Sequence, residues 1–362
     1  MEIPTDSIPR LPDELIVEIL TRLPVISLLR CRCVCKSWLS LISSPRFVRY
    51  HLRKAKQDPD YAHHRIMLNY HGDLMQCSVP SLLRQPIVDA FDTDYSVRFS
   101  MESCWIMGSC DGLICVAIDT KGLFLWNPST RVCKKLPDFG VNEDFCNFAY
   151  GLGFDKSSDD YKVVGVFIGD RNSYEVAVKV YSLKSNQWKR IENFKGRWLL
   201  DKPATYAHGK LHWIANYDWE FRSAWKIVSL DLGTEEYGVV EMPNNVENDL
   251  YSKLGASEEC LYLLCSHSSG ADLWIMDDCG VGKGTWTKVA SIPYIVDFTT
   301  HTYRSVLYVL ENGEVVLLSG LKFVIFNPKD CSFRSPEIRN TDALVAANII
   351  LKVWFHHSRD RC

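Results

Sequence analysis

The 362-residue chain lacks the features that mark several common classes of protein. Its formal net charge is −3, so it has no basic excess that would draw the whole molecule to nucleic acid or anionic lipid. Its first ten residues hold no apolar core of a signal peptide. The late apolar run around Asn348 and Lys352 is too short to cross about 30 Å of hydrocarbon. We expect a globular protein of the cytoplasm, the nucleus or both, with no nucleic-acid or membrane partner.

Motifs for catalysis and metal binding are also missing. The chain contains no GxSxG, HExxH or CxxC pattern. The stretch GVGKGT at 280–285 departs from a phosphate-binding loop at Asp277 and Gly284, so we predict a hairpin turn there. Cys31, Cys33 and Cys35 cannot all share one helix face, and the 14 cysteines have no secretory context, which favours reduced thiols. We predict no catalytic residue, metal or cofactor; the alternative, an enzyme assembled from distant residues, would purify with a bound metal or cofactor.

Within residues 11–45, apolar side chains recur at the spacing of helix faces. Pro12 and Asp13 suit a first helical turn, because proline lacks an N–H and an acid complements the positive end of the helix dipole. Pro24 and Pro45 interrupt the pattern, which predicts three short helices. The apolar stripe of the first helix consists of Leu15, Ile16, Ile19, Leu20 and Leu23.

Three helices in about 35 residues cannot enclose an independent core, so another domain or protein must cover part of their apolar surface. Residues 1–57 also carry ten Lys/Arg against five Asp/Glu, which leaves the rest of the chain at −3 − 5 = −8. Five of these cations lie in RFVRYHLRKAK at 46–56, where a helix would present a basic face.

The pattern of this region, LP-x-E-L, a second Leu-Pro pair and Val34-Cys35-Lys36-Ser37-Trp38, resembles the F-box family. The resemblance implies binding to a Skp1-like adaptor, which links the chain to a cullin and a RING subunit. Alternatively, the helices only cap the following domain. The adaptor-binding residues implied are Leu11, Pro12, Leu15, Ile16, Ile19, Leu20, Leu23, Leu28, Leu29, Val34, Cys35 and Trp38.

Behind the box, short apolar runs alternate with turn residues and repeat at an interval near fifty residues. Aligning Trp126, Tyr181, Leu230, Met276 and Phe326 gives separations of 55, 49, 46 and 50 residues. Met67 lies 59 residues before Trp126 and marks a degenerate sixth copy. This period is typical of kelch-like propeller blades. We predict an α+β, mainly β chain with a three-helix box and a β-propeller of about six blades; a β-sandwich is the alternative.

The repeats resemble the F-box-associated domain of large plant F-box families, which include S-locus F-box proteins and defence-regulating F-box/kelch proteins. SCDGLICV, LWNPSTR, DDYKVV and HGKLHWIA carry the likeness. True kelch repeats have a regular double glycine that is missing here. We place the box at 1–48, a linker helix at 49–62, the propeller at 63–350 and a tail at 351–362.

Together, these resemblances imply the substrate-recognition subunit of a Skp1-cullin-F-box ubiquitin ligase, with no chemistry of its own. The alternative is a scaffold that binds the adaptor without directing degradation. Two candidate target-binding loops mix aromatic and acidic residues, as protein-binding surfaces do; their rings could instead fold back over neighbouring blades. The target-binding residues proposed are Phe139, Phe145, Phe148, Tyr217, Trp219 and Phe221.

Overall fold

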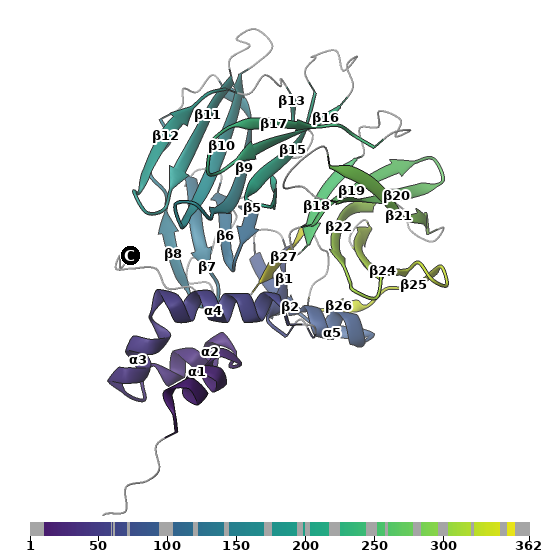
Figure 1. Ribbon diagram of the computed structural model, residues 1–362. Helices are drawn as coiled ribbons and strands as arrows, with labels where there is room; N and C mark the ends of the chain where they lie inside the picture. Colours follow the sequence, from purple (N-terminus) through teal and green to yellow (C-terminus); the bar gives the residue numbers. More distant parts are fainter. Residues whose placement is uncertain are drawn as a thin grey trace, which may run out of the picture.

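Four helices are followed by a ring of β-sheets (Figure 1). The computed structural model describes residues 11–58, 60, 62–70, 73–93, 104–118, 122–140, 145–169, 176–193, 198–199, 203–216, 225–243, 252–257, 260–277, 284–295, 303–319, 322–340 and 346–351. The helices are α1 (Asp13–Thr21), α2 (Val25–Cys31), α3 (Lys36–Ile42), α4 (Pro45–Lys56) and, within the β-region, α5 (Val79–Arg84). The three helices expected from the sequence are confirmed as α1 to α3.

Helix α4 completes the box and crosses residues 48 and 49, between which the sequence analysis divided box from linker. The Ser44 side chain caps it by accepting a hydrogen bond from the Phe47 N–H at 3.2 Å, and Pro45 begins the helix. Phe47 and Val48 add to the core of the first three helices. The buried side chains of this box core are Leu20, Val25, Leu28, Ile42, Phe47 and Val48.

Five blades of consecutive strands make up most of the propeller. Blade 1 comprises β5 (Cys104–Cys110), β6 (Leu113–Ile118), β7 (Gly122–Asn127) and β8 (Val132–Lys135). Blade 2 comprises β9 (Phe145–Asp155), β10 (Asp160–Gly169), β11 (Val176–Ser182) and β12 (Gln187–Ile191). Blade 3 comprises β13 (Trp198–Leu199), β14 (Thr205–Ala207), β15 (Lys210–Asn216), β16 (Lys226–Asp231) and β17 (Tyr237–Val240).

Blades 4 and 5 repeat the antiparallel pattern. Blade 4 comprises β18 (Lys253–Ser257), β19 (Cys260–His267), β20 (Gly270–Asp277) and β21 (Thr285–Pro293). Blade 5 comprises β22 (Tyr303–Val309), β23 (Val315–Ser319), β24 (Lys322–Asn327) and β25 (Ser332–Arg334). The sequence alignment is confirmed, because its five marker residues all lie buried in the next-to-last strand of a blade: Trp126, Tyr181, Leu230, Met276 and Phe326.

The remaining four-stranded sheet, here called the closing sheet, combines both ends of the chain. It pairs β27 (Ala346–Leu351) with β1 (His64–Tyr70), followed by β2 (Asp73–Ser78) and β4 (Phe91–Asp92). A parallel pair, β3 (Ile87–Asp89) and β26 (Glu337–Arg339), joins the same two regions. The expected count of about six blades is corrected to five blades of consecutive strands, because the sheet at the Met67 copy takes one strand from the far end of the sequence.

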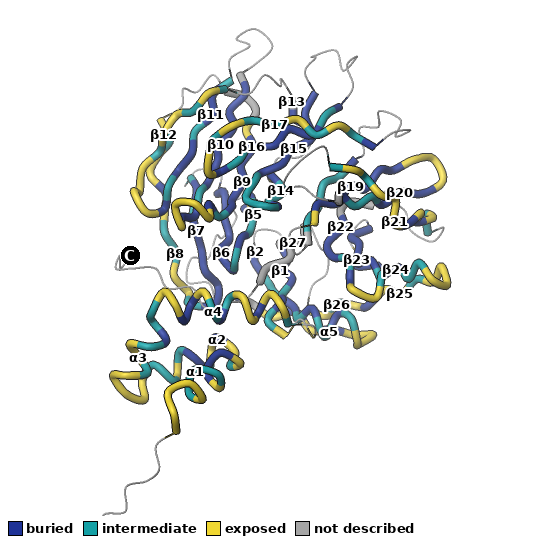
Figure 2. Tube along the Cα trace, viewed as in Figure 1, coloured by how far each residue is buried: buried dark blue, intermediate teal, exposed yellow. Residues whose placement is uncertain are grey.

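Apolar clusters join each sheet to the next. Met67 and Leu74 of the closing sheet pack with Ile114 of blade 1, whereas Ile66 and Leu68 on the same β1 pack with blade 5. Buried residues occupy the whole of β6, while buried and exposed segments alternate along α1 to α4 (Figure 2). The propeller therefore has a continuous core of its own, separate from the box core.

A buried ion pair within blade 2 is connected to blade 3 by a hydrogen bond. The Lys162 Nζ lies 2.9 Å from an Asp155 carboxylate oxygen and donates to the Leu232 carbonyl at 2.6 Å. Burial alone would raise the pKa of Asp155, but hydrogen bonds from Ser157, Ser158 and Lys162 outweigh it and hold that pKa below its usual range. Asp155 therefore stays ionised and anchors the turn after β9.

Two buried histidines predict acid sensitivity. The His64 ring lies 3.1 Å from the Tyr308 hydroxyl, and His212 lies 3.3 Å from the Thr205 carbonyl. Burial lowers the pKa of both imidazoles to about 4. Below about pH 6.5 these imidazoles bind protons in the unfolded chain but stay neutral in the folded chain. The free energy of unfolding should therefore fall as the pH is lowered from 6.5 to 4, by about 3 kcal/mol per histidine at pH 4.

Urea unfolding measured from pH 7.5 to 4.5 checks this expectation. The wild-type midpoint should decline through the range, and the His212→Gln chain should show a shallower decline. A wild-type midpoint that stays constant down to pH 4.5 would contradict the proposed effect of these histidines.

Candidate functional site

The box exposes a concentrated set of large apolar side chains. Leu15 and Ile19 are four residues apart on one face of α1, and Leu11 lies just before the start of that helix. The exposed fractions of Leu11, Leu15 and Ile19 are 56%, 50% and 52%, while Leu20, which follows Ile19, is 1% exposed. Six of the thirteen large apolar residues exposed in the described part of the chain lie in the box: Leu11, Leu15, Ile19, Ile26, Val34 and Leu39. An uncovered apolar surface of this density is typical of a protein-binding site.

The adaptor-binding residues proposed from the sequence fall into three groups. Leu11, Pro12, Leu15, Ile19, Val34 and Cys35 are exposed; Ile16, Leu23, Leu29 and Trp38 are partly buried; Leu20 and Leu28 are fully buried. The buried pair packs in the box core and not against the propeller. These two leucines therefore support the folded box, and the exposed group is free for contact.

Ile26 and Leu39 were missed by sequence reasoning. Ile26 stands three residues before Leu29, on the face of α2 opposite the buried Leu28. Helical spacing from Leu29 would have identified it. Leu39 follows Trp38 in α3 and is exposed while Ile42 is buried. Both residues extend the exposed apolar surface beyond α1.

Polar contacts hold the box helices in place behind this surface. Glu18 of α1 accepts hydrogen bonds from Arg22 at 2.7 Å and from the Tyr50 hydroxyl of α4 at 3.4 Å, and the Lys54 Nζ lies 3.7 Å away. The Arg22 hydrogen bond and the Lys54 charge lower the pKa of Glu18. At the start of α3, the Cys35 sulfur lies 3.0 Å from the Ser37 hydroxyl, and this contact lowers the pKa of the thiol. The exposed apolar residues thus stand on a fixed scaffold.

The proposed target-binding residues have mixed outcomes. Phe139 lies among Tyr150, Phe167 and Trp188, with its ring centroid 4.8 Å from that of Phe167, so it contributes to the core between blades. Phe148 is exposed near the start of β9, at the end of the strand far from α4. The Phe145 side chain and the loop residues Tyr217, Trp219 and Phe221 lie outside the described residues.

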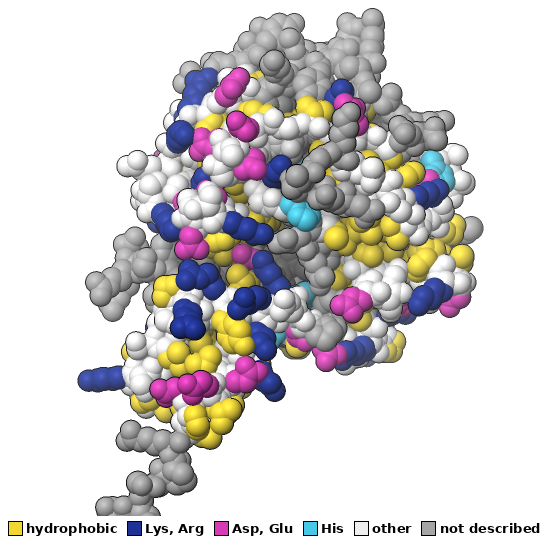
Figure 3. All heavy atoms as spheres, viewed as in Figure 1, with side chains coloured by type: hydrophobic (Ala, Val, Ile, Leu, Met, Phe, Trp, Pro, Cys, Tyr) yellow, Lys and Arg dark blue, Asp and Glu magenta, His cyan; other side chains and the backbone are white. Residues whose placement is uncertain are grey.

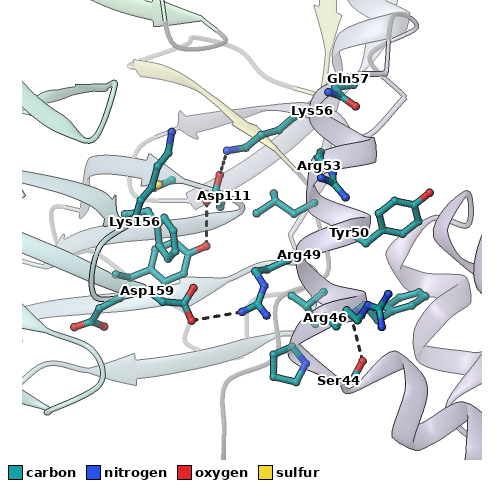
Figure 4. Close-up of a pocket in the computed structure, with 18 of the residues that line it drawn as sticks. Ser44, Arg46, Arg49, Tyr50, Arg53, Lys56, Gln57, Asp111, Lys156 and Asp159 are labelled. Carbon is teal, nitrogen blue, oxygen red and sulfur yellow. Dashed lines mark hydrogen bonds and ion pairs between the residues drawn. The ribbon is translucent and has the colours of Figure 1, made fainter. Parts of the chain in front are cut away.

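A cleft of about 1910 Å³ separates α4 from the propeller turns (Figure 4). Two ion pairs cross it: the Lys56 Nζ lies 2.6 Å from Asp111, and the Arg49 guanidinium lies 3.5 Å from Asp159. Lys and Arg side chains gather over α4 on the molecular surface (Figure 3). The helical prediction for the basic segment is confirmed by α4, and two of its cations, Arg49 and Lys56, reach the propeller.

Among the helices in the part of the chain that the structure describes, none has the length and the apolar composition needed to span a membrane. In that same part of the chain, no three His, Cys, Asp or Glu side chains come together as a set of metal ligands.

Comparisons with known proteins cover both regions. A family model described as an F-box associated beta propeller domain matches residues 59–358, and one described as an F-box domain matches residues 8–50. The chain is 32% identical to the F-box/kelch-repeat protein At3g23880 of Arabidopsis thaliana over 94% of each protein. It is 29% identical to the F-box protein CPR1 of the same plant over 94% of this chain and 87% of that one. The resemblances noted in the sequence are confirmed.

Proposed function

This chain belongs to the F-box proteins with an associated β-propeller domain, and from that premise we propose that it is the substrate-recognition subunit of a Skp1-cullin-F-box ubiquitin ligase. The exposed apolar surface of the box binds a Skp1-like adaptor, and the adaptor connects the chain to a cullin and a RING subunit. The propeller holds the target protein. These steps take place in the cytoplasm, the nucleus or both.

The observation that carries the proposal is the contrast between Ile19 and Leu20. The box already has a core of its own, made by Leu20 and Leu28 with α4, yet Ile19 and its neighbours along α1 remain uncovered. Burying about four such side chains at an interface removes several hundred Å² of apolar surface from water, which at about 25 cal/mol per Å² favours a stable complex. A helical cap that served only the propeller would have turned this face inward.

In this role the chain needs no catalytic residue. A ubiquitin-conjugating enzyme supplies the reactive thioester, and the receptor raises the effective concentration of a target lysine beside it. The target surface is expected at the strand ends far from α4, where Phe148 is exposed, because the box occupies the opposite ends. Loops carried by rigid strands are the usual location for such recognition.

Co-purification tests the proposal directly. Full-length tagged chain, co-expressed with a plant Skp1-like adaptor, a cullin and a RING subunit, should elute from a sizing column as one complex containing all four. If folded chain elutes without the adaptor, the proposed function is wrong. If the adaptor is retained while the cullin is excluded, the chain is instead a scaffold without a role in degradation.

A further inference from the structure

In the described residues, the apolar core of the box is separate from the apolar cores of the blades. Every side chain of the box core belongs to α1 to α4 or the turns between them, and no apolar cluster formed by the described residues joins the box to a blade. Domains without a shared apolar interface move relative to each other unless other contacts fix them. The polar contacts across the cleft are therefore candidates for fixing their relative orientation.

Those contacts come from one side of α4. Arg49 and Lys56 are seven residues apart, close to two helical turns, so both project from the same face with about 10 Å between them. Both point toward the propeller, while Tyr50 points away from it (Figure 4). They reach turns of two different blades, because Asp111 follows β5 and Asp159 follows β9. Two contacts at this spacing restrict the direction of the helix axis.

Asp111 is the more strongly built of the two anchors. Its side chain is only 7% exposed and lies against Lys56, and its second carboxylate oxygen accepts a hydrogen bond from the Tyr161 hydroxyl at 3.1 Å. Tyr161 is itself buried in the core between blades 1 and 2. By contrast, Arg49 and Asp159 are both more than half exposed, and exposed pairs contribute little. The side-chain contacts from Lys56 to Asp111 and from Asp111 to Tyr161 thus connect α4 to the propeller core.

A third contact fixes the far end of the connection. Asp58 accepts hydrogen bonds from the Asp60 and Ala62 N–H groups, which shapes the segment after α4. Asp60 in turn lies 2.7 Å from Arg84 of α5, beside the closing sheet. This pair is more than half exposed, like that of Arg49 and Asp159, so both support the orientation only weakly and the buried Asp111 is the main anchor.

We propose that Lys56 and Asp111 are positioning residues that set the angle between the adaptor-bound box and the target-bound propeller. The inference rests on the proposed function and deepens it. A fixed angle restricts which lysines reach the conjugating enzyme, because a misplacement of the reacting groups lowers the transfer rate even when both partners stay bound. These residues act through geometry and touch neither adaptor nor target.

The test measures the angle in the full chain bound to the adaptor. Spin labels at Ser40 of α3 and Lys329 of blade 5, both exposed, report the distance between the two domains. The wild-type chain, the conservative Lys56→Arg variant and the matched Arg46→Glu control on the same helix should each give one narrow distance distribution. Lys56→Glu should broaden it, because the new carboxylate repels Asp111.

The functional readout is ubiquitin transfer onto the propeller's own lysines in the reconstituted ligase. Lys56→Glu should bind the adaptor as wild type does, yet transfer about fivefold more slowly and to a wider set of lysines. If Lys56→Glu lowers the melting temperature, Asp111→Asn replaces it in both measurements. This variant removes the charge that attracts Lys56 but keeps an oxygen that accepts the hydrogen bond of the Tyr161 hydroxyl, and the same broadening and slower transfer are expected. If both variants keep a narrow distance distribution and the wild-type set of modified lysines, this inference is wrong but the proposed function stands. If the wild-type chain fails to bind the adaptor, the proposed function itself is wrong.

Discussion

Replacing Ile19 by aspartate is expected to weaken adaptor binding by about 100-fold or more, which corresponds to about 3 kcal/mol. In the free chain Ile19 is half exposed, so the new carboxylate stays in water and the folded box is unaffected. In the complex it would be buried against an apolar partner surface, where an unpaired charge is strongly unfavourable. Titration calorimetry with purified adaptor measures the affinity, and the melting temperature verifies the fold.

Val239→Asp is the matched control for this change. Val239 lies on β17 of the propeller and, like Ile19, is a β-branched apolar residue that is 52% exposed, so both changes place a carboxylate at an equally exposed position. Its affinity for the adaptor should equal that of the wild-type chain. Leu28→Asp should also abolish binding, but with loss of helical signal, because Leu28 is fully buried in the box core. Wild-type affinity in Ile19→Asp would exclude α1 from the adaptor interface.

The repeat was predictable because each copy has a local signal. Trp126 and Tyr181 occupy equivalent buried positions, and the strands around them alternate with turn residues within about fifty positions. The closing sheet has no such signal, since β27 pairs with β1 from nearly 280 positions away. The segment AANIIL carries no feature that identifies its partner strand, so the Met67 region was predicted to be a degenerate sixth copy of the repeat.

The division of the box surface was harder to predict for a similar reason. Ile19 and Leu20 are adjacent, equally apolar and about 100° apart around the helix, so the helical pattern accommodates both. Which of them is buried depends on α4, whose Phe47 lies in the box core with Leu20. The linker helix predicted at 49–62 includes most of α4. Exposed and buried leucines of the box were therefore grouped as one set.

Ending the chain at residue 345 should prevent stable folding of the propeller. The deletion removes β27, which pairs with β1 through six aligned residues from His64 to Asn69 and contacts strands of blades 1 and 5 (Figure 1). At about 1 kcal/mol net per lost backbone hydrogen bond, the deletion costs about 6 kcal/mol, which is comparable to the whole stability of a typical domain. It also exposes the edge of β1, which invites aggregation.

A chain that ends at Leu351 keeps β27 and is the matched control; its melting temperature should lie within about 3 °C of the full chain. The chain ending at 345 should lose its cooperative thermal transition, and a synthetic peptide of residues 344–353 added during refolding should restore it. Restoration by this peptide but not by a scrambled one assigns the effect to pairing with β1. A cooperative transition in the shorter chain at the melting temperature of the full chain would mean that packing of β1 and β2 against blades 5 and 1 closes the ring without β27.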